Sequence, residues 1–207
     1  MSAKLGIALI AVLSIGLAAI GGVAIARFAD NGDAARASVV DTTTDAPIVD
    51  CDSRIQVIPS RRHPGRIPRR LRKSSVFAGP VVFVSAKQFE GEAIEPGSKL
   101  LRPVKVPMLV AAGHAVTVAV SPPTGRYAVL EVGLDSRRQS VRGPSVELRP
   151  CSRRTKVASQ RVGRRTPFLG GFRLDGPMCL VLTVAVEGRS EPITRTVAFG
   201  KGACGAT

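Results

Sequence analysis

Short apolar runs separated by proline and glycine are the feature that most constrains how this chain can fold. They lie at residues 80–84, 104–110, 114–120, 127–134, 146–148, 168–174, 179–186 and 193–199. Runs of this length and composition between turn residues are typical of β-strands, and their spacing is typical of an antiparallel sandwich. We find no amphipathic helical period after residue 30. The sequence therefore predicts a mainly β domain, an antiparallel immunoglobulin-like (Ig-like) β-sandwich.

Two of these runs are interrupted by residues that disturb a strand. Pro107 lies inside residues 104–110, and because proline cannot donate a backbone hydrogen bond, we expect this strand at the edge of a sheet. Gly170 and Gly171 lie inside residues 168–174 and indicate a bend there.

The N-terminal segment predicts attachment of the domain to a membrane. Residues 5–26 carry no charged side chain, and as a helix they would span ~33 Å, enough to cross the hydrocarbon core of a membrane. We predict a transmembrane helix, or signal anchor, after a cytoplasmic tail at residues 1–4. The alternative is a cleaved signal peptide and a secreted protein, because small residues at 24 and 26 and at 35 and 37 fit a cleavage site.

The next segment differs in composition from the rest of the chain. Residues 27–50 hold several aspartates, three consecutive threonines and few large apolar residues. Such a composition cannot form a core. We expect residues 27–50 to be a flexible acidic tether and residues 51–207 to be the folded domain.

Four cysteines follow the apolar run: Cys51, Cys151, Cys179 and Cys204. An even number without a Cys-x-x-Cys pair favours structural disulfides in an oxidising compartment, and buried free thiols in a cytosolic domain are the alternative. We therefore predict a single-pass protein of the cell membrane with an extracytoplasmic C-terminal domain. Of the three possible pairings we favour Cys151 with Cys179, which closes a basic loop, and Cys51 with Cys204, which joins both ends of the domain.

The charge is strongly positive, with 30 Lys and Arg against 15 Asp and Glu and a formal net charge of +15. Such a field attracts anions. Two clusters without acidic residues carry much of it, and Pro64 and Pro68 favour an extended arm in the first. Anionic lipid or cell-wall polymer is the expected partner, and solvated loops without a specific ligand are the alternative, which is the commoner reason for such clusters. The candidate anion-binding residues are Arg61, Arg62, Arg66, Arg69, Arg70, Arg72, Lys73, Arg153, Arg154, Arg164 and Arg165.

Residues for catalysis are few. The two histidines, His63 and His114, have no evident partner, and residues 90–95 hold three glutamates that fit a solvated acidic turn. No catalytic motif and no zinc-ligand spacing occurs. We expect no enzyme, no cofactor and no metal, with a hydrolase acting on envelope material as the alternative. The basic arm lacks interleaved aromatic residues, so nucleic acid is not an expected partner.

Several segments around the last three cysteines carry a resemblance. They are Leu-Arg-Pro-Cys at 148–151, Thr-Pro-Phe-Leu-Gly-Gly-Phe at 166–172, Gly-Pro-Met-Cys-Leu-Val-Leu at 176–182 and Phe-Gly-Lys-Gly-Ala-Cys at 199–204. With the N-terminal span, these resemble a group of membrane-anchored extracytoplasmic proteins of high-GC Gram-positive (actinobacterial) bacteria. The resemblance covers mainly residues 145–204 and implies no activity. The hypothesis from sequence is thus a membrane-anchored extracytoplasmic domain that binds or scaffolds.

Overall fold

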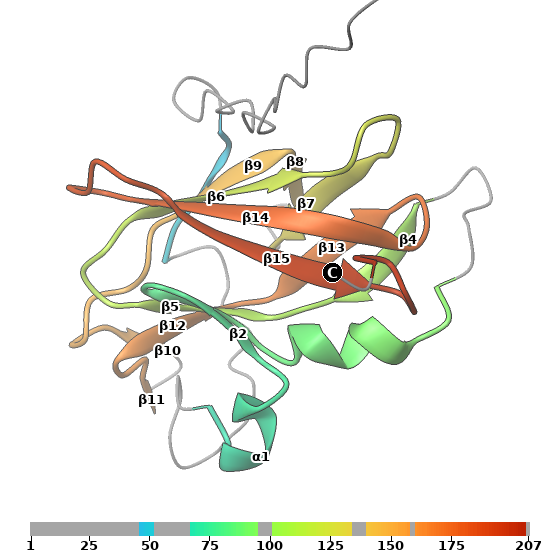
Figure 1. Cartoon of the computed structure of the whole chain (residues 1–207). Coiled ribbons are helices and arrows are strands. Elements are labelled where there is room, and N and C mark those ends of the chain that lie inside the picture. Colours follow the sequence, from blue (N-terminus) through green and yellow to red (C-terminus); the bar gives the residue numbers. More distant parts are fainter. Residues whose placement is uncertain (1–45, 52–66, 95–100, 134–139, 158–159, 206–207) are drawn as a thin grey trace, which may run out of the picture. The chain divides into compact units, whose positions relative to one another are not determined.

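The computed structural model describes residues 46–51, 67–94, 101–133, 140–157 and 160–205. These residues form a mainly β, mainly antiparallel structure (Figure 1), which confirms the mainly β, antiparallel part of the predicted fold class. The predicted cytoplasmic tail, transmembrane helix and most of the tether lie outside the described residues. Within the described ranges, no helix is both long enough and apolar enough to cross a membrane.

Sheet A contains the clearest strands, in the order β1-β9-β6-β14-β15. Its strands are β1 (Ile48–Val49), β9 (Ser145–Leu148), β6 (Val116–Ser121), β14 (Met178–Val186) and β15 (Ile193–Phe199). Along β14 every second residue is buried and those between are half-exposed, so the alternation of its sequence follows the two faces of a sheet. β1 pairs parallel to β9, so the sheet begins at Ile48, inside the range expected for the tether.

Two further sheets, B and C, are connected by segments of chain that bend from one sheet into the other. Sheet B has the order β12-β5-β3-β2, and sheet C has the order β4-β13-β7-β8. Their strands are β2 (Val76–Ala78), β3 (Val81–Phe83), β4 (Arg102–Lys105), β5 (Met108–Ala111), β7 (Ala128–Val132), β8 (Val141–Gly143), β12 (Arg165–Phe168) and β13 (Gly170–Leu174). The chain passes from sheet C to sheet B between β4 and β5, and from sheet B to sheet C between β12 and β13.

The bends lie where the sequence indicated interruptions. At the bend, the Val106 N–H donates to the Gly170 carbonyl oxygen (2.9 Å). A Cβ on Gly171 would overlap the Val104 carbonyl oxygen and lie 2.8 Å from the Val106 nitrogen, so only glycine fits this close approach. The run at 104–110, predicted as one edge strand, forms two strands, β4 and β5. The prediction of an edge is confirmed for β4, which has one neighbour, and is wrong for β5, which lies between β12 and β3.

One apolar core lies between the sheets. Phe172 of sheet C is its centre, with ring centroids 6.3 Å from Phe83 of sheet B and 5.0 Å from Phe199 of sheet A. All three side chains are almost fully buried. Because each large ring belongs to a different sheet, their packing holds the three sheets together.

Short elements complete the described structure: α1 (Arg69–Arg72), η1 (Ala86–Gly91), β10 (Lys156–Val157) and β11 (Gln160–Arg161). α1 lies within the segment expected to be an extended arm, so that prediction is wrong for residues 69–72. Pro68 precedes the helical turn at its N-cap, a place where proline does not interrupt helical hydrogen bonds. The 3₁₀ helix η1 was not expected either.

Both disulfides differ from the predicted pairing, which is wrong. Cys51 bonds to Cys151, with Cα atoms 4.8 Å apart, and Cys179 bonds to Cys204, with Cα atoms 4.5 Å apart. Parallel pairing of β1 with β9 carries Cys51 alongside Cys151. In sheet A the antiparallel partner of Cys179 is Ala198, and the turn after β15 returns Cys204 to it. Strand pairing, which the cysteine spacing does not reveal, decides which cysteines meet.

Candidate functional site

The outer face of sheet B carries the helical turn α1. Ile67 and Leu71 pack on Val82 and Leu109, which point away from the main core. This apolar contact fixes the turn on the sheet, and the basic side chains around Leu71 are exposed: Arg69, Arg70, Arg72 and Lys73. The first basic cluster is therefore partly held in place on a β-sheet.

Strand β12 brings the second cluster to the same face. Pro167 lies opposite Leu109, and because side chains alternate along a strand, Arg165 points to the side of Pro167. Thr166, between them, is fully buried on the core side. Arg165 is half-buried, and its Nε is buried without a hydrogen-bond partner. Arg164, just before it, is exposed.

Arg153 and Arg154 lie on the loop that leads to β10, and both are exposed. The base of this loop is fixed by the Cys51–Cys151 disulfide and by the Cys151 N–H, which donates to Thr166 Oγ1 (2.8 Å). In Figure 1, α1 and the β10–β11 hairpin both lie at the lower side of the view. We define the basic face as the predicted residues that the structure describes: Arg69, Arg70, Arg72, Lys73, Arg153, Arg154, Arg164 and Arg165.

The remaining predicted residues, Arg61, Arg62 and Arg66, lie outside the described residues, as does His63. Among the described residues, the ion pairs of acidic side chains go to arginines outside the basic face: Arg126, Arg142, Arg149 and Arg173. The basic face therefore directs uncompensated positive charge at the solvent, where it attracts anions.

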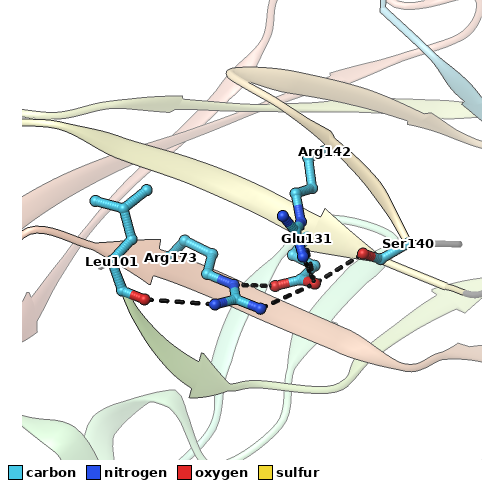
Figure 2. Close-up of polar contacts among 5 residues, drawn as sticks. All are labelled: Leu101, Glu131, Ser140, Arg142 and Arg173. Atoms are coloured by element: carbon cyan, nitrogen blue, oxygen red, sulfur yellow. Dashed lines mark hydrogen bonds and ion pairs between the residues drawn. The ribbon is translucent and has the colours of Figure 1, made fainter. Parts of the chain in front are cut away.

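A different arrangement occupies the outer face of sheet C (Figure 2). Glu131 of β7 accepts hydrogen bonds from Arg173 of β13, from Arg142 of β8 (Nη2, 2.9 Å) and from the Ser140 hydroxyl (2.7 Å). These donors, Arg173 first, lower the pKa of Glu131 from 4.5 to about 2, although burial opposes the shift. The same carboxylate raises the pKa of Arg173. Sequence reasoning missed this cluster, because Glu131 and Arg142 face each other only once the strand register is known.

The described histidine and glutamates that were considered for catalysis are not members of this cluster. His114 is exposed on the wall of a hollow of about 780 Å³ on sheet A, which Glu147 and Glu187 also line. Glu90 and Glu92 are exposed at the end of η1, and Glu95 lies outside the described residues. In the described part of the chain, no three His, Cys, Asp or Glu residues gather as metal ligands would.

Comparison with known proteins adds no relative to this picture. No protein-family model, curated protein or solved structure matches the chain. The function is therefore inferred from two outer faces of the molecule, the basic face on sheet B and the Glu131 cluster on sheet C.

Proposed function

We propose that this chain is a membrane-anchored extracytoplasmic domain that binds phosphate-bearing anions of the cell envelope through its basic face. One observation carries the proposal. Basic residues from two segments far apart in the sequence, α1 and β12, share the outer face of sheet B and have no acidic partner among the described residues.

The location is supported by two independent features. Both pairs of cysteines are joined in disulfides, which form and persist in oxidising compartments outside the cytosol. Residues 5–26 are long and apolar enough for one span. The resemblance to extracytoplasmic actinobacterial proteins agrees with this location. A secreted form with the segment removed is the alternative.

We also propose the Ig-like sandwich as the finer description of the domain. Sheets A and C, antiparallel except for the β1–β9 pair, share one core through Phe172 and Phe199, as the two layers of a sandwich do. The strands that bend at Gly170 and at Pro107 would then form the corners between layers.

The energetic basis is additive electrostatics. Each Lys or Arg close to an anionic surface gains about 1 kcal/mol, and the gain falls off within about a Debye length. Several exposed cations on one rigid face approach an anionic surface together. Their combined attraction is therefore expected to exceed that of the same charges scattered over the domain, and to weaken as salt increases.

The test uses the full chain held in nanodiscs of zwitterionic lipid. Capture of vesicles containing phosphatidylglycerol, and of inorganic polyphosphate, is measured over a salt series. The triple variant Arg69→Gln, Arg70→Gln, Arg72→Gln should weaken capture by about 10- to 100-fold. The matched control is Lys105→Gln, Arg189→Gln, Lys201→Gln, which removes three exposed charges from other elements and should change capture by less than about threefold.

The outcomes separate the explanations. Equal losses in both triple variants would mean that net charge alone attracts anions, and the proposed face would be rejected. Capture that does not respond to salt would reject it as well. Preference for vesicles over polyphosphate would identify lipid headgroups as the source of phosphate, and the reverse would identify a soluble polymer.

A further inference from the structure

A second hollow, of about 410 Å³, lies on the outer face of sheet C next to the Glu131 cluster. This volume is within the range of small-ligand sites, about 300–1,000 Å³. Its wall combines aromatic, apolar and cationic side chains: Leu101, Tyr127, Val129, Arg142, Pro144 and Arg173. The hollow lies on a different sheet from the basic face, so its ligand can differ from the anions proposed for that face.

Tyr127 provides the aromatic surface of this hollow. Its side chain is among the most exposed of the large apolar or aromatic residues, at 54%, whereas three of the phenylalanine rings make the core. Its backbone is fixed on both sides, because its N–H donates to Asp175 Oδ2 (2.9 Å) and its carbonyl oxygen accepts from the Asp175 N–H (3.2 Å). Arg126 in turn pairs with Asp175 (3.0 Å). An exposed ring on a fixed backbone can act as a flat stacking surface.

Two guanidinium groups flank this surface and share one carboxylate. Arg142 and Arg173 both donate to Glu131, and Arg173 also donates to the Leu101 carbonyl oxygen (3.4 Å). Figure 2 shows Glu131 between the two arginines. Because one carboxylate cannot neutralise two guanidinium groups, one positive charge remains at the wall of the hollow. The hydrogen bonds hold both planar groups in place before any ligand arrives.

We propose that this hollow binds a sugar ring that carries a carboxylate. The Tyr127 ring covers the apolar face of the sugar, as amphipathic aromatic side chains do at binding surfaces. The guanidinium group with uncompensated charge pairs with the sugar carboxylate, because Arg binds carboxylates in a planar, two-point geometry. Guanidinium N–H groups of Arg142 and Arg173 that are not directed at Glu131 bond to the sugar hydroxyls.

The chemistry of the site favours this ligand over a phosphate group. A phosphate has no apolar face for Tyr127, and the carboxylate of Glu131 would repel its second charge. A neutral sugar would stack equally well but would leave the extra guanidinium charge unpaired. The acidic sugar is the class of ligand that uses every feature of the wall.

Tyrosine fluorescence gives a direct readout, because the chain has one Tyr and no Trp. All tyrosine emission of the full chain therefore comes from Tyr127. Titration with oligomers of glucuronic acid should change this emission saturably, whereas glucose oligomers of the same length should require an at least tenfold higher concentration. Arg142→Gln should weaken binding of the acidic oligomer by about tenfold. It should weaken binding of the neutral oligomer much less, because the neutral oligomer has no carboxylate to pair with the guanidinium group.

Two controls keep this test separate from the proposal for the basic face. The Arg69→Gln, Arg70→Gln, Arg72→Gln variant should bind the acidic oligomer like the parent chain. Calorimetry on Tyr127→Ala, with thermal unfolding to check that it is folded, should show lost binding. An emission change that polyphosphate reproduces, or that the α1 variant abolishes, would overturn the saccharide site and leave the basic face standing. Absence of any saturable change would overturn it as well.

Discussion

The outer faces of sheets B and C both carry arginines, but they use them in opposite ways. On sheet C, Arg142 and Arg173 converge on Glu131. On sheet B, Arg165 and the arginines of α1 have no acidic partner among the described residues. The same residue type thus shares a carboxylate on sheet C, which compensates one of two positive charges, and has no acidic partner among the described residues on sheet B. The position of an acidic residue in the strand register decides between the two roles.

Burial strengthens this difference. The side chains of Glu131 and Arg173 are 20% and 28% exposed, so their hydrogen bonds are partly shielded from water and contribute more than surface ion pairs do. On α1 only Leu71 is turned toward the sheet, and the arginines beside it are exposed. Removing charge should therefore cost more stability on sheet C than on sheet B, where it should weaken capture of phosphate-bearing anions.

The largest expected effect tests whether the two faces belong to one cooperative unit. Gly171→Ala would place a Cβ against the Val104 carbonyl oxygen at the bend that joins sheets B and C. We expect the free energy of unfolding to fall by more than about 4 kcal/mol, measured by chemical denaturation. Gly91→Ala is the control, since nothing lies within 4 Å of its Cβ. Separate unfolding of the sheets would contradict a single unit.

Removal of a disulfide should have the next largest effect on stability, and only one of the two disulfides supports the basic face. Their sequence separations are 100 and 25, and a longer closed loop is stabilised more. Replacing Cys51 and Cys151 by Ser should therefore cost about 4 kcal/mol and replacing Cys179 and Cys204 about 3 kcal/mol, both within the range usual for native disulfides. Denaturation under non-reducing conditions measures both. Only the first pair holds the loop of Arg153 and Arg154, so only its loss should weaken capture of anionic vesicles. Equal effects on capture would contradict this division.

Acid should weaken the Glu131 cluster of sheet C. The pKa of Glu131 is about 2 in the folded chain, below its ordinary 4.5, so its stabilising effect is complete above about pH 4.5 and is lost as pH falls toward 2. Glu131→Gln should lower the free energy of unfolding by about 1–2 kcal/mol at pH 7. The difference between parent and variant should vanish near pH 2. A difference that is constant with pH would show that the charge of Glu131 is not responsible.

The smallest effect compares single arginines from the two faces. Arg173→Gln should destabilise the chain by about 1 kcal/mol, because Glu131 loses its main donor. Arg70→Gln should change stability by less than about 0.5 kcal/mol, because it is exposed and unpaired among the described residues. Thermal unfolding of both variants measures the difference. Similar losses would mean that the arginines of α1 also support the fold.

The positions of many strands could be predicted from the local sequence, whereas the pairing of strands could not. The run at 193–199 coincides with β15, and the run at 179–186 lies within β14, because alternating burial leaves a period in the sequence. Short strands such as β8 carry no such period and were missed. The helical turn α1 was missed because its single apolar contact, Leu71, is defined by sheet B and not by a helical repeat.

The candidate sites divide in the same way. The basic residues at 69–73 and 164–165 are visible in the sequence, which predicts anion binding for both groups. Their placement on one face depends on the pairing of β12 with β5, which Pro167 and Leu109 show only in three dimensions. The cluster around Glu131 could not be predicted from the sequence, because Arg142 and Arg173 come from other strands.

The sequence by itself determined the β class, most strand positions, the apolar N-terminal run and the excess of positive charge, because each of these is a property of neighbouring residues. The tertiary structure alone decided which cysteines bond, which arginines find a carboxylate and which are left to the solvent. Those outcomes depend on register between strands, and register is fixed by packing of the whole core around Phe83, Phe172 and Phe199.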